Sequence, residues 1–161
     1  MAYNDVYTGL SGSQAVAATT ATAVISLYGT AAKRLWLTGV RVKVLVTAAA
    51  AGNDIRFQLA RPGNTVNGSG LASGGPHDFS SPASLGQIST TWTTAPTVGT
   101  ILAEWVVPQT TGSMWEEFPP TGNEWGAPAI ANNNANSGLH LFAIPTVNTS
   151  TPVSVDLIWG E

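Results

Sequence analysis

The sequence contains no cysteine and very little charge. The missing thiols exclude a disulfide framework, thiolate metal sites and thiol catalysis, so rigidity has to come from packing and assembly. Charged residues make up 9% of the chain, whereas about 25% is usual in soluble domains. A monomer with so little charge would be weakly protected against association. The composition therefore favours a protein that packs against other subunits, as adhesive and virion proteins do.

Basic residues are too few and too scattered to form a stripe that follows a phosphate backbone. Six Lys and Arg stand against nine Asp and Glu, and four of the six form the local pairs Lys33/Arg34 and Arg41/Lys43. Binding of nucleic acid is therefore not expected. Arg41 and Lys43 also interrupt the longest apolar stretch, so no membrane span is expected. The first residues lack a basic segment followed by an apolar run, which indicates synthesis in a cytoplasm without a cleaved leader.

Helical periodicity is lacking, and alternation of apolar and polar residues takes its place. Near the end of the sequence Val153, Val155, Leu157 and Trp159 share one face, and Ile158 is the one apolar exception on the other. This pattern predicts a half-buried strand. Strands are predicted in the same way over residues 19–28, 35–46, 55–59, 101–107, 113–118, 125–131, 139–144 and 153–159, with weak strands near Leu71 and Ile88.

Two of these strands allow their inward faces to be predicted residue by residue. In the strand over residues 35–46, Gly39 indicates a bulge or a close backbone approach, and Arg41 and Lys43 face outward. The inward residues are predicted to be Trp36, Thr38, Val40, Val42, Val44 and Val46 in this strand, and Ile101, Ala103, Trp105 and Val107 in the strand over residues 101–107.

About eight strands with frequent turn residues are typical of an all-β fold built as an antiparallel β-sandwich. Long crossovers favour an eight-stranded jelly roll over an immunoglobulin-type sandwich. We expect one β-sandwich domain over residues 19–161. Residues 1–18 show no period and are expected to form an extended N-terminal arm that reaches a neighbour. The Gly-, Ser- and Pro-rich stretch over residues 65–84 predicts a long surface loop, a feature that is usually functional or interface-forming.

Candidate contact residues lie in or beside the loops. Trp92, Trp115 and Trp125 are placed to anchor a protein interface, to pack loops over the sandwich or to stack on sugars, and the sequence leaves these alternatives open. His77 is a further candidate for an interface. His77 and His140 lack the spacing of a metal site, so neither a metal nor a cofactor is predicted.

The carboxylates form no recognisable catalytic pattern. Glu116 and Glu117 are adjacent and point to opposite faces of a strand, so they cannot act as a pair. Glu104, Glu124 or Asp156 would have to meet one of them in space for glycosidase chemistry. No serine lies in a Gly-x-Ser-x-Gly elbow, and no glycine-rich loop leads into a helix or a lysine. The chain is therefore predicted not to be an enzyme.

Several strand-and-turn segments resemble those of small structural proteins of tailed bacteriophages. The similarity covers residues 20–160 in order and spacing. The segments that carry it are Lys33-Arg-Leu-Trp-Leu37, Trp92-Thr-Thr-Ala-Pro96, Phe118-Pro-Pro-Thr-Gly122, Ala127-Pro-Ala-Ile-Ala131, Leu139-His-Leu-Phe-Ala143 and Val153-Ser-Val-Asp-Leu-Ile-Trp159.

The resemblance implies a jelly-roll or similar sandwich that sits on the capsid surface of a virion as a decoration or cement protein, commonly as a homotrimer. Its partner would be the major capsid protein. Many weak contacts, repeated over a symmetric oligomer, raise the avidity of such attachment. Two other functions are weighed against this one. The chain could be a phage tail or fibre subunit that binds host-surface glycan through Trp115, Trp125 and the loop at 65–84, or a glycan-active enzyme that uses carboxylates from several strands.

Overall fold

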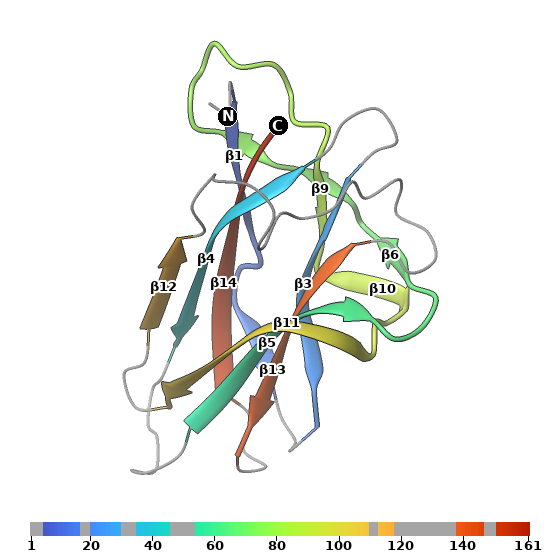
Figure 1. Cartoon of the computed structure of the whole chain (residues 1–161), viewed down its shortest axis with the longest axis vertical. Coiled ribbons are helices and arrows are strands. Elements are labelled where there is room, and N and C mark those ends of the chain that lie inside the picture. Colours follow the sequence, from blue (N-terminus) through green and yellow to red (C-terminus); the bar gives the residue numbers. More distant parts are fainter. Residues whose placement is uncertain are drawn as a thin grey trace.

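The computed structural model describes residues 5–16, 20–29, 35–45, 54–109, 113–117, 138–146 and 151–161. These residues form an antiparallel β-sandwich without a helix (Figure 1), which confirms the predicted all-β class. The strand predicted over residues 125–131 lies outside the described residues. The strands are β1 (Val6–Leu10), β2 (Gln14–Val16), β3 (Thr22–Tyr28), β4 (Trp36–Val44), β5 (Asp54–Pro62), β6 (Asn67–Ser69), β7 (Ala72–Ser73), β8 (Gly75–Pro76), β9 (Gln87–Ser89), β10 (Thr91–Thr94), β11 (Val98–Pro108), β12 (Ser113–Glu117), β13 (Leu139–Pro145) and β14 (Thr151–Gly160).

Two large sheets make up the sandwich. Sheet A has the order β12-β4-β14-β1-β8, with β2 also paired to β14, and sheet B has the order β11-β5-β13-β3-β9-β7. Among the longer strands, β5 and β11 pair within one sheet, whereas the chain otherwise changes sheet from one long strand to the next. Neighbours in each sheet are therefore far apart in sequence, and the fold depends on long-range pairing.

The core lies between the two sheets, and β14 runs through the middle of sheet A. Val153, Val155, Leu157 and Trp159 are all completely buried, so the face predicted for this strand is confirmed. β5 presents Ile55, Phe57 and Leu59 to the same core from sheet B. Alternation placed these side chains correctly because each strand is buried on one regular face.

A bulge in β4 changes which side chains reach the core. The pairing of β4 with β14 passes from Gly39 to Leu37 in one step, so Thr38 is an extra residue and the bulge predicted at Gly39 is confirmed. An extra residue reverses the faces of the side chains beyond it. Leu37 is consequently buried and Trp36 is only half-buried. The inward face predicted from Val40 to Val44 is correct, but it is wrong for Trp36 and Thr38.

The same effect operates in β11. Its pairing with β5 shifts between Ile101 and Ala103. Ala103 and Trp105 pack against the core and Val107 is buried, as predicted, whereas Ile101 is 46% exposed. The inward position predicted for Ile101 is therefore wrong, because the shift in register turns it to solvent.

The first strands belong to the sandwich. β1 pairs with β14 along its whole length, and β2 pairs with the other half of β14. Tyr7 and Val16 are completely buried. An extended arm over residues 1–18 is therefore wrong for residues 5–16. These short strands have no clear period of their own and are held in the sheet by their pairing with β14.

The segment between β5 and β11, residues 63–97, closes one side of the sandwich and is called the inserted segment below. β8 pairs with β1 in sheet A, while β9 pairs with β3 and β7 pairs with β9 in sheet B. β6 and β10 form a separate two-stranded sheet. The stretch predicted as a surface loop over residues 65–84 is thus partly strand. Its very short strands cover sheet edges that would otherwise invite pairing with other chains.

Trp159 joins this inserted segment to the core. Its ring stacks on Tyr7 with centroids 6.2 Å apart. Gly74 and Gly86 lie so close to the ring that side chains there would collide with it, and a side chain at Gly9 would collide with Ile88 beside the ring. A Cβ atom built at Gly74 would lie 2.3 Å from a ring carbon of Trp159. Glycine at these positions is what allows the segment to close over the indole.

Candidate interaction surfaces

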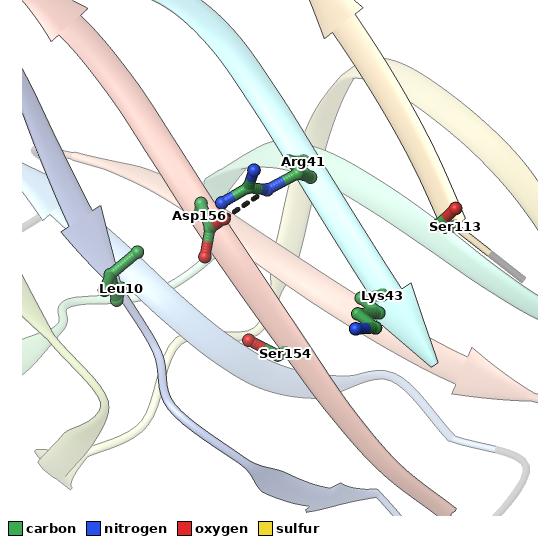
Figure 2. Close-up of a pocket in the computed structure, with 6 residues that line it drawn as sticks. All are labelled: Leu10, Arg41, Lys43, Ser113, Ser154 and Asp156. Atoms are coloured by element: carbon green, nitrogen blue, oxygen red, sulfur yellow. Dashed lines mark hydrogen bonds and ion pairs between the residues drawn. The ribbon is translucent and has the colours of Figure 1, made fainter. Parts of the chain in front are cut away.

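A hollow of about 490 Å³ lies on the outer face of sheet A, and Figure 2 shows the side chains that surround it. They come from β1, β4, β12 and β14, so four neighbouring strands contribute to one surface. The lining residues are Leu10, Arg41, Lys43, Ser113, Ser154 and Asp156.

These side chains form two rows across the sheet. Asp156 lies between Leu10 and Arg41 in the strand pairing, and Lys43 lies between Ser154 and Ser113. Residues directly opposite one another in a sheet share a face, and the alternate positions of β4 and β14 point into the core. The sequence correctly predicted that Arg41 and Lys43 face outward. It did not predict the hollow, because the pairing of β4 with β12 and β14 cannot be read from either strand alone.

Charge in the hollow is unevenly distributed. The Arg41 guanidinium reaches across to Asp156, and its Nε donates a hydrogen bond to Asp156 Oδ2 (Figure 2). The side chain of Asp156 is only 10% exposed, whereas that of Arg41 is 56% exposed. Lys43 adds a second positive charge beside the hydroxyls of Ser113 and Ser154. The surface can therefore donate hydrogen bonds to hydroxyl or anionic oxygens.

A polar cluster covers the outer face of sheet B. The indole N–H of Trp92, on β10, donates to Ser26 Oγ at 2.9 Å and to the Tyr28 hydroxyl at 3.2 Å. Ser26 Oγ lies 2.6 Å from Nδ1 of His140, and the Tyr28 and His140 rings meet edge to face. Trp92 thus attaches the small β6–β10 sheet to sheet B. Its indole nitrogen is already used within the chain, and its role in an interface stays a prediction.

His140 belongs to this polar cluster and lies where its charged form is disfavoured. It has no exposed surface, and its Nε2 has no hydrogen-bond partner within the part of the chain that the structure describes. Burial lowers the pKa of His140 from 6.5 to about 4, because the charged imidazolium loses its hydration. The ring is therefore neutral at physiological pH.

The other predicted contact residues lie apart from this cluster. His77 is exposed next to β8, and its Nε2 is hydrogen-bonded to the hydroxyl of Thr8. Trp115 lies in β12, opposite Arg41 in the pairing with β4. Trp125 lies outside the described residues. The structure therefore does not bring His77, Trp92 and Trp115 together as one site.

β11 carries two exposed apolar side chains, Ile101 and Val106. We use the name β11 edge for the side chains of Ile101, Leu102, Ala103, Trp105 and Val106, of which Leu102, Ala103 and Trp105 are partly buried and pack against the core. β11 is the outermost strand of sheet B, with β5 its partner on one side. Ile101 and Val106 are 46% and 61% exposed. From Ala103 to Pro108 the strand pairs with β5 without a shift in register.

Two of the carboxylates considered for catalysis, Asp156 and Glu104, lie in different sheets. Asp156 lies in sheet A beside Arg41, and Glu104 lies in sheet B, where it accepts a hydrogen bond from Gln58 at 2.5 Å. Across the described ranges, no three His, Cys, Asp or Glu side chains gather where they could hold a metal ion. No helix long and apolar enough to cross a membrane occurs in the same ranges.

Neither the comparison with protein-family models nor the comparison with curated proteins finds a match to this chain.

Proposed function

We propose that this chain is a capsid decoration protein of a tailed bacteriophage, which binds the major capsid protein, cements the shell and catalyses no reaction. Its strand-and-turn segments, which resemble those of small phage structural proteins, support the proposal, as does its scarcity of charge. Its location would be the outer surface of the virion capsid, after synthesis in the host cytoplasm.

We also assign the sandwich to the jelly-roll class. The strands of five or more residues are, in chain order, β1, β3, β4, β5, β11, β12, β13 and β14. With these numbered one to eight, sheet A has the order 6-3-8-1 and sheet B the order 5-4-7-2. Two interlocked Greek keys produce such an order in a jelly roll, and viral capsid proteins often have that fold. A fold alone does not define a function, so the surface features have to decide.

The β11 edge is the observation that carries the proposal. One side of the sandwich is closed by the inserted segment, whereas on the other side β11 exposes the apolar side chains of Ile101 and Val106. Its one charged residue, Glu104, is held by Gln58 and lies 3.8 Å from Arg56 Nε. A long edge strand without an outward lysine is a template for pairing or packing with another chain. The edge therefore favours a protein that functions in an assembly.

We propose that the β11 edge joins the copies of a homotrimer. Replacing Val106 with lysine places a charge on this edge, and it is expected to raise the dissociation constant of the trimer by at least about tenfold. Native mass spectrometry over a dilution series measures the effect. Ala72→Lys adds the same charge to β7 at the opposite end of sheet B and is expected to leave the trimer intact. A wild-type monomer, or equal effects of the two variants, contradicts this interface.

The attachment to a capsid is tested with shells of the major capsid protein that lack this chain. Added wild-type protein is expected to co-sediment with the shells, to saturate at a fixed number of copies per shell, and to raise the temperature at which the shells break. Trimeric attachment multiplies weak single contacts, so Val106→Lys is expected to bind more weakly than Ala72→Lys. Absence of binding by the wild-type chain counts against the proposal.

A second candidate function is that of a tail or fibre subunit that binds a host-surface glycan. The hollow on sheet A favours it, because Lys43, Ser113 and Ser154 offer hydrogen bonds to sugar hydroxyls next to the Arg41–Asp156 pair. Binding to a panel of glycans separates the two functions. Saccharide binding that disappears in Lys43→Ala supports the glycan function, whereas shell binding that survives in Lys43→Ala supports the capsid function.

A further inference from the structure

Phe79 is fully exposed at the corner of a loop that projects from one end of the sandwich. The loop comprises residues 77–86, between β8 and β9, and is called the 77–86 loop below. Its apex lies beyond the start of β1 and the end of β14 (Figure 1). The relative exposure of Phe79 is 105%, the highest of the exposed large apolar residues in the described ranges. Single exposed apolar side chains are common on protein surfaces, so what distinguishes Phe79 is the way in which its loop is held.

The turn that contains Phe79 is closed by hydrogen bonds between Asp78, which precedes it, and Ser80 and Ser81, which follow it. The Ser81 N–H donates to the Asp78 carbonyl at 3.0 Å, which makes Phe79 the second residue of a β-turn. Asp78 Oδ1 accepts from the Ser80 N–H and from the Ser80 hydroxyl, each at 2.8 Å. These two bonds stabilise the charged carboxylate and so lower the pKa of Asp78. They also hold the turn closed.

The start and the middle of the loop are hydrogen-bonded to β1. The His77 N–H donates to the Val6 carbonyl at 2.9 Å, and the His77 ring is hydrogen-bonded to Thr8. The hydroxyl of Tyr7 donates to the Pro82 carbonyl at 2.9 Å. Because Tyr7 is completely buried and stacks on Trp159, this bond connects the loop to the core.

The second half of the loop is attached to Glu161. The carboxylate accepts from Ser84 Oγ at 2.6 Å, from the Gly86 N–H at 2.8 Å, from the Leu85 N–H at 3.1 Å and from the Trp159 indole at 3.2 Å. Partial burial raises the pKa of the Glu161 carboxyl, but these four hydrogen bonds outweigh it and the pKa is lowered. The loop is therefore held at its start, at its turn and at its end.

We propose that Phe79 is the anchor that docks this protein on the capsid shell, where its ring enters an apolar socket of the major capsid protein. The inference rests on the proposed capsid function. A preorganised loop loses little conformational entropy when it binds, so the burial of its ring contributes almost fully to affinity. Single aromatic side chains that fill pockets commonly dominate the affinity of protein interfaces.

The surroundings of Phe79 favour an apolar socket over a sugar. An aromatic ring that stacks on a saccharide works together with polar groups that bind the hydroxyls. Here Oδ1 of Asp78 accepts hydrogen bonds from Ser80, and the Ser84 hydroxyl donates to Glu161. These polar groups hold the loop itself, whereas the Phe79 ring is fully exposed to a partner.

The test compares the binding of Phe79→Ala and wild-type protein to capsid shells that lack this chain. We expect Phe79→Ala to keep its melting temperature and its trimeric state, and to lose at least about tenfold in shell affinity. Leu85→Ala removes another exposed apolar side chain from the same loop and is expected to change the affinity less than twofold. Equal losses in the two variants, or an unchanged affinity of Phe79→Ala, overturn the anchor. Failure of wild-type protein to bind overturns the capsid function itself.

A second measurement locates the ring without relying on affinity. Because the chain contains no cysteine, Phe79→Cys can be labelled at a single position with an apolar, environment-sensitive dye. Its emission is expected to shift to shorter wavelength when shells are added, whereas a dye on Thr65→Cys is expected to stay unchanged. A shift caused by self-association or by saccharide, and not by shells, overturns the proposed partner.

Discussion

Replacing Trp159 with alanine is expected to lower the free energy of unfolding by about 3–5 kcal/mol. The ring is completely buried, stacks on Tyr7 and fills the space between the inserted segment and β1. A loss of this size is a large part of the about 5–15 kcal/mol that stabilises a typical domain. Urea denaturation measures it. Phe79→Ala removes an aromatic ring from an exposed site, and its effect is expected to stay within about 0.5 kcal/mol.

A double-mutant cycle tests whether Gly74 is required because of Trp159. Gly74→Ala puts a Cβ atom within 2.3 Å of the ring, so the substitution alone is expected to cost about 1–3 kcal/mol through overpacking. In the Trp159→Ala background the collision is absent, and the same substitution is expected to cost much less. Additive effects would contradict the close packing of the inserted segment on this ring.

Acidification is expected to destabilise the fold between pH 6.5 and pH 4 through His140. In the unfolded chain this ring takes up a proton near its ordinary pKa of 6.5, whereas burial lowers the folded pKa to about 4. The unfolded state therefore binds more protons in this window, and stability falls as the pH falls. At about 1.4 kcal/mol for each pH unit, the loss approaches about 3 kcal/mol at the lower end. Denaturation midpoints measured along a pH series report it.

A variant of His140 separates the effect of its titration on stability from the effect of its packing. His140→Asn removes the titrating ring, so whatever its stability at pH 7, its dependence on pH between 4 and 6.5 is expected to be flatter than that of wild type. Burial also raises the pKa of the neighbouring Tyr28 hydroxyl, so this group stays neutral throughout the window. An equal slope in His140→Asn and wild type would assign the acid sensitivity to other groups.

The regular part of the fold could be predicted from alternation alone. Val153 to Trp159 and Ile55 to Leu59 each keep one face in the core, so a period of two residues was sufficient to find strand and face. The bulge at Gly39 was also predicted. Its consequence for Trp36 was missed, because the face of a side chain beyond a bulge depends on where the pairing partner shifts.

Long-range pairing explains the other errors. β1 and β2 are short and irregular in sequence, and their place in sheet A depends on β14. In the inserted segment, the weak strands predicted near Leu71 and Ile88 correspond to β7 and β9, whereas β6 and β8 carry no periodic signal and were missed. The hollow and the supports of Phe79 combine residues from distant parts of the chain, as with Ser84 and Glu161. The position of β11 at the edge of sheet B likewise depends on which strands pair. Single-sequence patterns contain local information only, so such sites could not be found before the strands were paired.

We propose that this chain acts by attaching to a capsid shell. The most direct test is the thermal disruption of shells that lack the chain, followed by light scattering before and after wild-type protein is restored. We expect saturable binding and a higher disruption temperature, with the gain reduced in both Val106→Lys and Phe79→Ala. Shells that break at the same temperature with and without the protein, at concentrations that saturate every site, would contradict it.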